Sequence, residues 1–240
     1  MLDTIKKDVS FSGMVGHRGL GGVETENTLR AFNEGGKRSY VGLECDVHST
    51  KDKIIVVSHD SSLLRVGNVD MKIPEHTFEE LRAVKFPDLN TGKIEDDLFV
   101  PLLTEYLHVC KKYDKRPVIE LKETLSEEDI EEVIKEVKES GLIDKVIFIS
   151  FFPGYLTKVR RMLPDVEIEF LSQIYTPGIL DFCSQFKFGI DAYYKVMTKE
   201  IIDAYHKAGL KVNVYTVDNK EDVERLVSYD IDYITSNIVE

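Results

Sequence analysis

The chain has 240 residues, 42% of them hydrophobic, which is enough for one large domain with a substantial core and excludes wholesale disorder. Its 31 basic and 43 acidic side chains give a formal net charge of −12. Nucleic acid and anionic membranes would be repelled by such a surface, so we expect neither as the main partner. A small anionic substrate held in a local basic pocket stays compatible with this charge.

The cysteines and the N-terminal segment bear on where the protein works. Cys45, Cys110 and Cys183 are an odd, widely spaced set, which is typical of reduced thiols in a cytoplasm and not of a disulfide framework. The first 13 residues hold no apolar run of the kind that a secretory signal needs. No segment approaches the roughly 20 apolar residues of a spanning helix. We therefore predict a cytoplasmic protein without stable membrane association.

Strand-like apolar runs alternate with amphipathic helix-like runs from about residue 12 onward. The predicted strands lie at 15–17, 41–47, 54–57, 117–122, 146–151, 167–171, 188–191, 210–216 and 232–235. The predicted helices lie at about 28–36, 77–84, 103–113, 126–140, 153–163, 177–186, 198–208 and 219–228. The strand at 54–57 follows 41–47 too closely for a crossover helix, so these two are predicted to pair antiparallel. The other eight strands are of the parallel type.

Residues 61–100 interrupt this alternation. The segment is polar, contains Pro74 and Pro87, and holds one short predicted helix near 77–84. Long loops inside compact domains usually serve function, so we predict an insertion or lid and not a second domain. Eight repeated βα units favour a closed (β/α)8 TIM barrel over a doubly wound sheet. The prediction is a single α/β barrel domain over 1–240, with a small insertion after the second strand.

Three carboxylates are predicted to meet at the mouth of this barrel. Glu44 and Asp46 are two apart on one strand and so face the same side, with Cys45 turned away from them. Glu120 and Lys122 repeat this spacing on the next parallel strand. Carboxylates that converge repel one another unless a cation lies between them. One hard divalent cation with oxygen ligands, Mg²⁺ or Ca²⁺ more than Zn²⁺, is the predicted cofactor, and salt bridges to Lys122 and Arg18 are the alternative.

Two histidines end the strands that flank these carboxylates. His17 and His59 have ordinary pKa values near neutral pH, so they suit a general acid and a general base, and a role as metal ligands is the alternative. Arg18 offers a planar donor fork that matches phosphate oxygens, and Lys122 adds a point positive charge. Acid, base, hard cation and basic donors together indicate phosphoryl transfer.

The same residues carry a resemblance to the glycerophosphodiester phosphodiesterase family, over nearly the whole chain from about residue 13. The matching motifs are His17-Arg18-Gly19, Glu26-Asn27-Thr28, Gly42-x-Glu44-x-Asp46, His59-Asp60, Leu64-Arg65, Val100-Pro101-x-Leu103-x-Glu105, Glu120-Leu121-Lys122 and Tyr215-Thr216-Val217. Two positions differ from the family's usual pattern. Tyr215 stands where a Trp is common, and Ser236-Asn237 stands where an Asp before a proline is common.

The resemblance implies a metal-dependent (β/α)8-barrel hydrolase of glycerol and lipid metabolism. Its substrate would be a small glycerophosphodiester, cleaved to sn-glycerol 3-phosphate and an alcohol. Glu44, Asp46 and Glu120 match the family's metal ligands, and His17 and His59 match its acid/base pair. Arg18, Lys122 and Tyr215 match substrate contacts, and the segment after His59 matches an insertion over the barrel mouth.

Several alternatives stay open at this point. Each histidine can be the acid or the base, and the attacking oxygen can come from water or from the neighbouring glycerol hydroxyl through a cyclic phosphate. The other functions to weigh are a lysophospholipase D-like phosphodiesterase, which would need an exposed apolar rim, a Schiff-base aldolase using Lys122, and a phosphodiester-binding barrel without activity. The head group, the choice of Mg²⁺ or Ca²⁺ and the oligomeric state are not determined.

Overall fold

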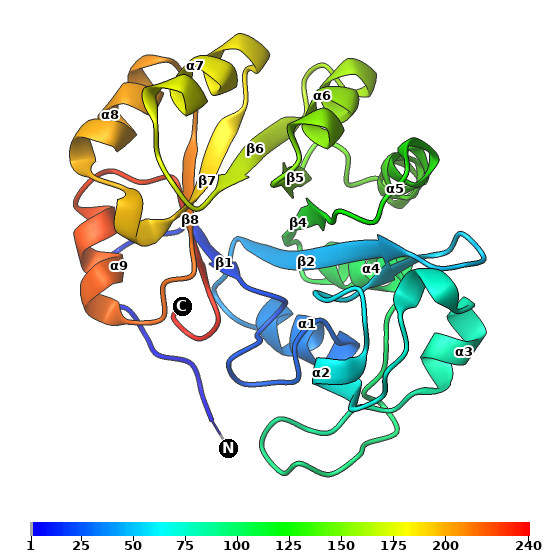
Figure 1. Ribbon diagram of the computed structural model, residues 1–240. Coiled ribbons are helices and arrows are strands. Elements are labelled where there is room, and N and C mark those ends of the chain that lie inside the picture. Colours follow the sequence, from blue (N-terminus) through cyan, green and yellow to red (C-terminus); the bar gives the residue numbers. More distant parts are fainter. Residues whose placement is uncertain (1) are drawn as a thin grey trace.

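Eight parallel strands close into a barrel, as predicted (Figure 1). The fold is a computed structural model that describes residues 2–240. Its strands are β1 (Met14–Gly16), β2 (Gly42–Ser49), β3 (Ile55–Val57), β4 (Arg116–Leu121), β5 (Ile147–Ser150), β6 (Glu167–Ser172), β7 (Gly189–Tyr193), β8 (Val212–Tyr215) and β9 (Tyr233–Ser236). The ring runs from β1 through β2 and β4 to β9, which pairs with β1 again. β3 stays outside the ring and pairs antiparallel with β2.

Helices cover the outside of the ring and connect successive strands (Figure 1). They are α1 (Leu29–Gly36), α2 (Leu64–Gly67), α3 (Phe78–Ala83), α4 (Leu103–Lys112), α5 (Glu127–Ser140), α6 (Pro153–Met162), α7 (Pro177–Phe186), α8 (Lys199–Lys207) and α9 (Lys220–Val227), with short 3-10 turns η1 (Ile73–Glu75) and η2 (Tyr194–Val196). None of these helices, within residues 2–240, is both long and apolar enough to cross a lipid bilayer.

Local sequence explains why α5 begins and ends where it does. The Ser126 side chain accepts a hydrogen bond from the Asp129 amide, and the Asp129 carboxylate accepts one from the Ser126 amide in return. Ile130, Val133, Ile134 and Val137 are buried, as their spacing predicts. Gly141 ends the helix in the left-handed region at φ 76°, where glycine carries no steric penalty.

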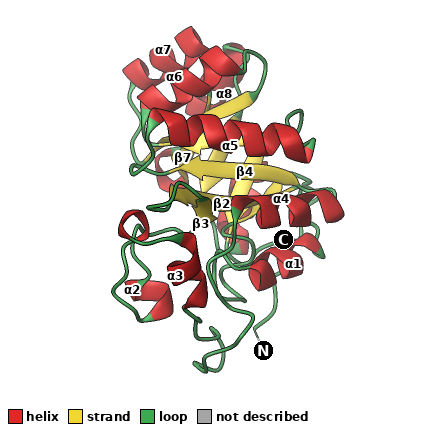
Figure 2. Cartoon of the chain, turned by 90° about the vertical axis from the view of Figure 1, so that its right-hand side faces the viewer, coloured by secondary structure: helices red, strands yellow, loops and turns green. Residues whose placement is uncertain are grey.

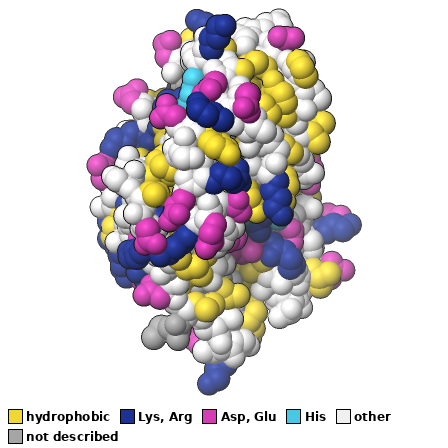
Figure 3. Space-filling model, turned by 90° about the vertical axis from the view of Figure 1, so that its left-hand side faces the viewer, with side chains coloured by type: hydrophobic (Ala, Val, Ile, Leu, Met, Phe, Trp, Pro, Cys, Tyr) yellow, Lys and Arg dark blue, Asp and Glu magenta, His cyan; other side chains and the backbone are white. Residues whose placement is uncertain are grey.

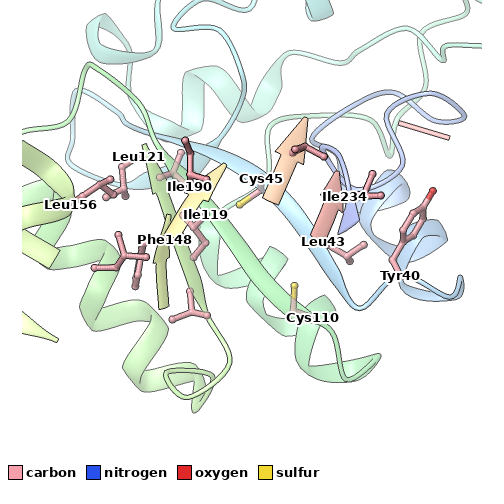
Figure 4. Close-up of a cluster of buried hydrophobic side chains, with 14 of the residues drawn as sticks. Tyr40, Leu43, Cys45, Cys110, Ile119, Leu121, Phe148, Leu156, Ile190 and Ile234 are labelled. Atoms are coloured by element: carbon pink, nitrogen blue, oxygen red, sulfur yellow. The ribbon is translucent and has the colours of Figure 1, made fainter. Parts of the chain in front are cut away.

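The alternation of side chains along the strands divides the barrel into an outer core and an inner channel. On β2 and β4, Leu43, Cys45, Ile119 and Leu121 are fully or nearly fully buried in the hydrophobic core outside the ring (Figure 4). The residues between them therefore point into the ring. Cys45 is turned away from the carboxylates, as predicted, and all three cysteines are free thiols.

The insertion is more ordered than the sequence predicted. One short helix was expected, but α2, η1 and α3 all form, around a small core of their own: Val56, Leu63, Ile73, Leu81, Phe86, Leu98 and Val100. The apolar spacing there is too short and irregular for periodicity to reveal. The segment lies beside β2 and β3 (Figures 1 and 2). Arg30 of α1 holds it there by ion pairs with Asp88 and Asp97.

The surface is mixed in charge despite the acidic total. On the face that carries α8 and α9, acidic and basic side chains are intermingled (Figure 3). Many of them form ion pairs within one helix, such as Lys199 with Asp203 at 2.7 Å. Pairs of this kind contribute little stability and offer no large uniform field to a polyanion.

Candidate functional site

A cavity of about 240 Å³ opens at the carboxyl ends of the barrel strands, where barrel enzymes hold their active sites. Seven of the eight predicted site residues line this cavity. The eighth, Asp46, does not, but it contacts Arg18 and Lys122, which do. The lining residues are His17, Arg18, Glu44, His59, Glu120, Lys122, Ile149, Phe151, Leu171, Gln173, Asp191, Tyr215, Thr216 and Thr235. No residue of 61–100 is among them, so the covering role of the insertion stays a prediction.

The three predicted carboxylates meet at one side of this cavity. Asp46 and Glu120 are direct neighbours across the β2–β4 pair, and Glu44 precedes Asp46 by one inward position. One oxygen of each lies within 4.8 Å of the others. The outer oxygen of Glu44, Oε1, is buried and has no hydrogen-bond partner. A buried acceptor without a partner is costly, and a cation bound by the three carboxylates would supply that partner. The donor set therefore fits a hard divalent cation.

Burial and mutual repulsion hold the cluster in unequal protonation states. Burial, then Asp46 and Glu120, raise the pKa of Glu44 well above its usual range. Burial and Asp46 raise the pKa of Glu120 to about 8. For Asp46 burial acts in the same direction, but Lys122 and Arg18 outweigh it and hold its pKa below the usual range. The cluster thus binds protons near neutral pH when no cation neutralises it.

This arrangement predicts how the stability of the cation-free protein depends on pH. Between pH 6.5 and 8 the folded state holds a proton on Glu120 that the unfolded state has lost, so stability falls as pH rises. His17, whose pKa is lowered to about 4, contributes in the opposite direction, but its deprotonation in the unfolded state is half complete at pH 6.5 and ends at about pH 7.5, so it offsets only part of the fall. The 1.5-unit window corresponds to about 2 kcal/mol, or roughly 3–6 °C in Tm. Thermal melts of chelated protein should show this fall, and Glu120→Gln should make it smaller, while Glu44 and Glu136, whose pKa values burial also raises, keep the remainder. An unchanged slope in Glu120→Gln would contradict the assignment.

His17 is held by partners from the far end of the chain. Its Nδ1 lies 2.7 Å from Asn237 Oδ1, and the amide Nδ2 of Asn237 donates to Asp218 Oδ2 at 2.7 Å. Since the amide nitrogen is committed to Asp218, the amide oxygen faces His17 and Nδ1 carries the proton. The other ring nitrogen, Nε2, lies 3.9 Å from Glu44 Oε2. Burial and then Arg18 lower the pKa of His17 to about 4, so the ring is neutral.

His59 contacts a carboxylate, whereas His17 contacts an amide. Its Nδ1 lies 2.6 Å from the Asp60 carboxylate, which also accepts from Arg65 Nε at 2.7 Å. Arg65, on α2 of the insertion, makes two further hydrogen bonds to Glu26 at 3.0 and 2.7 Å. His48 contacts the backbone carbonyl of His59 through Nε2 at 3.2 Å. A carboxylate behind His59 and an amide behind His17 distinguish the two rings.

The two basic residues, Arg18 and Lys122, pair with carboxylates and line the same cavity as Glu44 and Glu120. Lys122 Nζ is 3.0 Å from Glu120 and 3.4 Å from Asp46. Arg18 donates to Glu26 at 2.8 Å, and its Nε is buried without a hydrogen-bond partner. Its backbone amide donates to Glu44 Oε2 at 2.7 Å, which requires the left-handed turn of Arg18 (φ 50°) and Gly19 (φ 84°). A side chain on Gly19 would meet the backbone of α1 at 2.8 Å.

Several residues that hold the site residues in place had no predicted role. Thr28 caps α1, and the residue before it, Asn27, donates to Asp46 at 2.8 Å. Glu26, Asp60 and Arg65 belong to the quoted motifs, which was the only signal available for them. Asn237 stood out only as a departure from the family pattern. Asp218 carried no signal at all.

A parallel barrel with an acid-lined, histidine-flanked cavity at its carboxyl end is the architecture of the barrel hydrolases. The model of the glycerophosphoryl diester phosphodiesterase family matches residues 17–240. The chain therefore belongs to this family, and it is an enzyme of the phosphoric diester hydrolase class.

Individual relatives and structures agree with this membership. A glycerophosphodiester phosphodiesterase of Caldanaerobacter subterraneus subsp. tengcongensis is 29% identical over 93% of each chain. One from Bacillus altitudinis is 28% identical over 91% of each chain. The structure of an Oleispira antarctica phosphodiesterase, in complex with the product sn-glycerol-3-phosphate, superposes with a TM-score of 0.87 at 23% identity, covering 94% of this chain and 92% of that one.

Proposed function

We propose that this enzyme hydrolyses glycerophosphodiesters to sn-glycerol 3-phosphate and an alcohol, using a bound divalent cation and the pair His17 and His59. The observation that carries the proposal is the convergence of both imidazoles and the carboxylate cluster on one cavity. The solved relative with bound sn-glycerol-3-phosphate supports the same substrate class.

The carboxylates Glu44, Asp46 and Glu120 would hold the cation, which supplies Lewis-acid stabilisation of the phosphoryl oxygens. Arg18 and Lys122 line the same side of the cavity and contribute positive charge toward the phosphate. Together with a bound cation, these two donors would offset the negative charge that develops on the phosphoryl oxygens in the transition state.

The hydrogen-bond partners of the two histidines differ, and we base the proposed roles on this difference. His17 is neutral, and its Nδ1–H is committed to Asn237, so its free Nε2 accepts the proton of the attacking oxygen. As the proposed acid, His59 directs its Nδ1–H to the Asp60 carboxylate, which fixes the ring so that Nε2 faces the cavity side of the contact. His59 then gives its Nε2 proton to the oxygen of the leaving alcohol. One proton is taken and one is delivered, and the starting states return when His17 releases its proton to solvent and His59 takes one up.

A coupled assay for glycerol 3-phosphate tests the function directly. Glycerophosphocholine and glycerophosphoethanolamine are expected to release glycerol phosphate in the presence of Mg²⁺ or Ca²⁺. Release of the free alcohol in equal amount would confirm the bond that is cleaved. No release from any glycerophosphodiester with either cation would refute the proposal.

Arg65 is expected to position both His59 and Arg18. It binds Asp60, which contacts His59, and it binds Glu26, which accepts from Arg18. Loss of these charge-assisted hydrogen bonds in Arg65→Ala should lower kcat about tenfold, with a smaller change in KM, since Arg65 does not line the cavity. Arg65→Lys should recover part of the loss.

The matched control for this prediction is Arg30→Ala. Arg30 also ties the insertion to the barrel, through Asp88 and Asp97, but it touches neither histidine network. If Arg65→Ala and Arg30→Ala lower kcat equally, Arg65 acts only by anchoring the insertion.

Lysophospholipids are a second candidate substrate class. The loops after β5 and β6 expose Phe152 and Ile174, with 40% and 61% of their surface accessible, near the cavity entrance. This is the apolar rim that an acyl chain would require. Lysophosphatidylcholine belongs in the same assay for this reason. The Schiff-base alternative loses support, because Asp46 and Glu120 outweigh burial and raise the pKa of Lys122, which keeps the amine charged.

A further inference from the structure

The cavity has two halves of opposite chemical character. The residues from β1 through β4 supply all of its basic side chains: His17, Arg18, His59 and Lys122. The residues from β5 through β8 supply none of these, and carry Phe151, Tyr215 and Asp191 together with aliphatic side chains. A phosphodiester that places its phosphate in the first half must direct one of its two alcohol groups toward the second.

The two aromatic rings form an open corner on this second half. The ring of Phe151 meets that of Tyr215 at a centroid distance of 6.2 Å and an angle of 88°. Phe151 keeps 37% of its surface accessible although it is a large apolar residue. Tyr215 is oriented by a hydrogen bond from its hydroxyl to the carbonyl oxygen of Ser172 at 3.3 Å. Two roughly perpendicular π faces beside a cavity are suited to a cation with an apolar shell.

An unpartnered carboxyl group lies beneath this corner. Asp191 is 2% exposed, lines the cavity, and has a buried oxygen, Oδ1, without a hydrogen-bond partner. Below it Glu169 is fully buried and accepts a hydrogen bond from Asn213 at 3.1 Å. None of these groups takes part in the proton transfers proposed above. Burial raises the pKa of Asp191, and a quaternary ammonium in the cavity would favour its ionised form. A carboxyl group with an unpartnered oxygen, lining the same cavity as two aromatic rings, therefore suits such a cation.

We propose that Phe151, Tyr215 and Asp191 form a subsite for the leaving alcohol, and that this subsite makes the enzyme prefer alcohols that carry a quaternary ammonium group. The inference rests on the proposed function and specifies which diester the site selects. Ile149 and Leu171, both nearly fully buried, complete an apolar floor that accommodates the methyl groups. Uncharged polyol head groups would gain no cation–π contact with these rings.

The test compares glycerophosphocholine with its 3,3-dimethylbutyl ester analogue, in which carbon replaces nitrogen. The two substrates share shape and differ in charge, so the ratio of their kcat/KM values isolates recognition of the cation. We expect wild-type enzyme to favour the choline ester roughly 5- to 30-fold. Phe151→Leu, Tyr215→Leu and Asp191→Asn should each reduce this ratio to below about 3. The rate on the neutral ester shows whether each variant is folded.

Phe152→Leu is the matched control. It removes a ring from the same loop, but Phe152 packs against Tyr155 and does not line the cavity, so the ratio should stay at the wild-type value. A wild-type ratio near 1, or a ratio that none of the three cavity variants lowers, would overturn the subsite. Glycerophosphoglycerol, as a third substrate, distinguishes failure of the subsite from failure of the proposed function. If it is cleaved as fast as the choline ester, only the subsite is wrong, whereas release of glycerol phosphate from none of the three diesters overturns the function as well.

Discussion

Replacing either His17 or His59 with alanine is expected to lower kcat by roughly 10²–10⁴ while the fold is retained. Both rings line the cavity, and neither belongs to the apolar core, so their removal should leave the circular dichroism spectrum and the Tm close to wild type. His108→Ala is the control, because His108 lies exposed on α4, away from the cavity. Near-wild-type turnover in His17→Ala or His59→Ala would refute the acid/base assignment.

The same variants can separate the two roles. A diester with a p-nitrophenol leaving group needs little protonation, so loss of the general acid costs less with that substrate. We expect His59→Ala to recover much of its lost rate on such a diester and His17→Ala to recover little. The opposite pattern would reverse the assignment that the Asp60 and Asn237 partners support.

Chelation is expected to lower activity by at least about 10³-fold, with recovery on addition of Mg²⁺ or Ca²⁺. Cation binding should also raise the Tm, because it neutralises carboxylates that repel one another in the free cluster. In Glu44→Gln and Asp46→Asn, both the recovery and the Tm increase should be greatly weakened. Calorimetric titration with each cation measures the affinity without any substrate.

Glu169→Gln is the matched control for these variants. Glu169 is a fully buried barrel glutamate whose pKa is also raised by burial and by Asp191, but it does not belong to the three-carboxylate cluster. It should therefore keep wild-type cation affinity. Equal loss of cation binding in Glu169→Gln and Glu44→Gln would mean that the cation is not held by the predicted cluster.

Much of this protein follows from local sequence. The alternation of strands and helices can be predicted from the spacing of apolar residues, because periods of 2 and 3.6 decide which side chains face the core. The same period explains why Glu44 and Asp46 share the inner face while Cys45 joins the core with Cys110 (Figure 4). The closure of the barrel brings Glu120 opposite Asp46, as the count of eight parallel strands predicted. The family motifs supplied the expected site.

The structure of the insertion could not be predicted from residue spacing. Its α2 and η1 are four and three residues long, too short for a periodic signal. They are stabilised by a core that forms only when Val56 of β3, Leu63 and Val100 come together. Propensity within so short a segment is weak, and tertiary packing decides the outcome.

The residues and their order determined the barrel and the chemical groups of the site, since both depend on short-range spacing. Only the tertiary structure decided which partner each group has. Asn237 reaches His17 across 220 positions, and Arg65 joins Glu26 across 39. The aromatic corner of Phe151 and Tyr215 is likewise assembled from β5 and β8. Such partners depend on strand closure and loop path, which no local pattern encodes. They are the basis on which we propose which histidine is the base and which side of the cavity takes the alcohol.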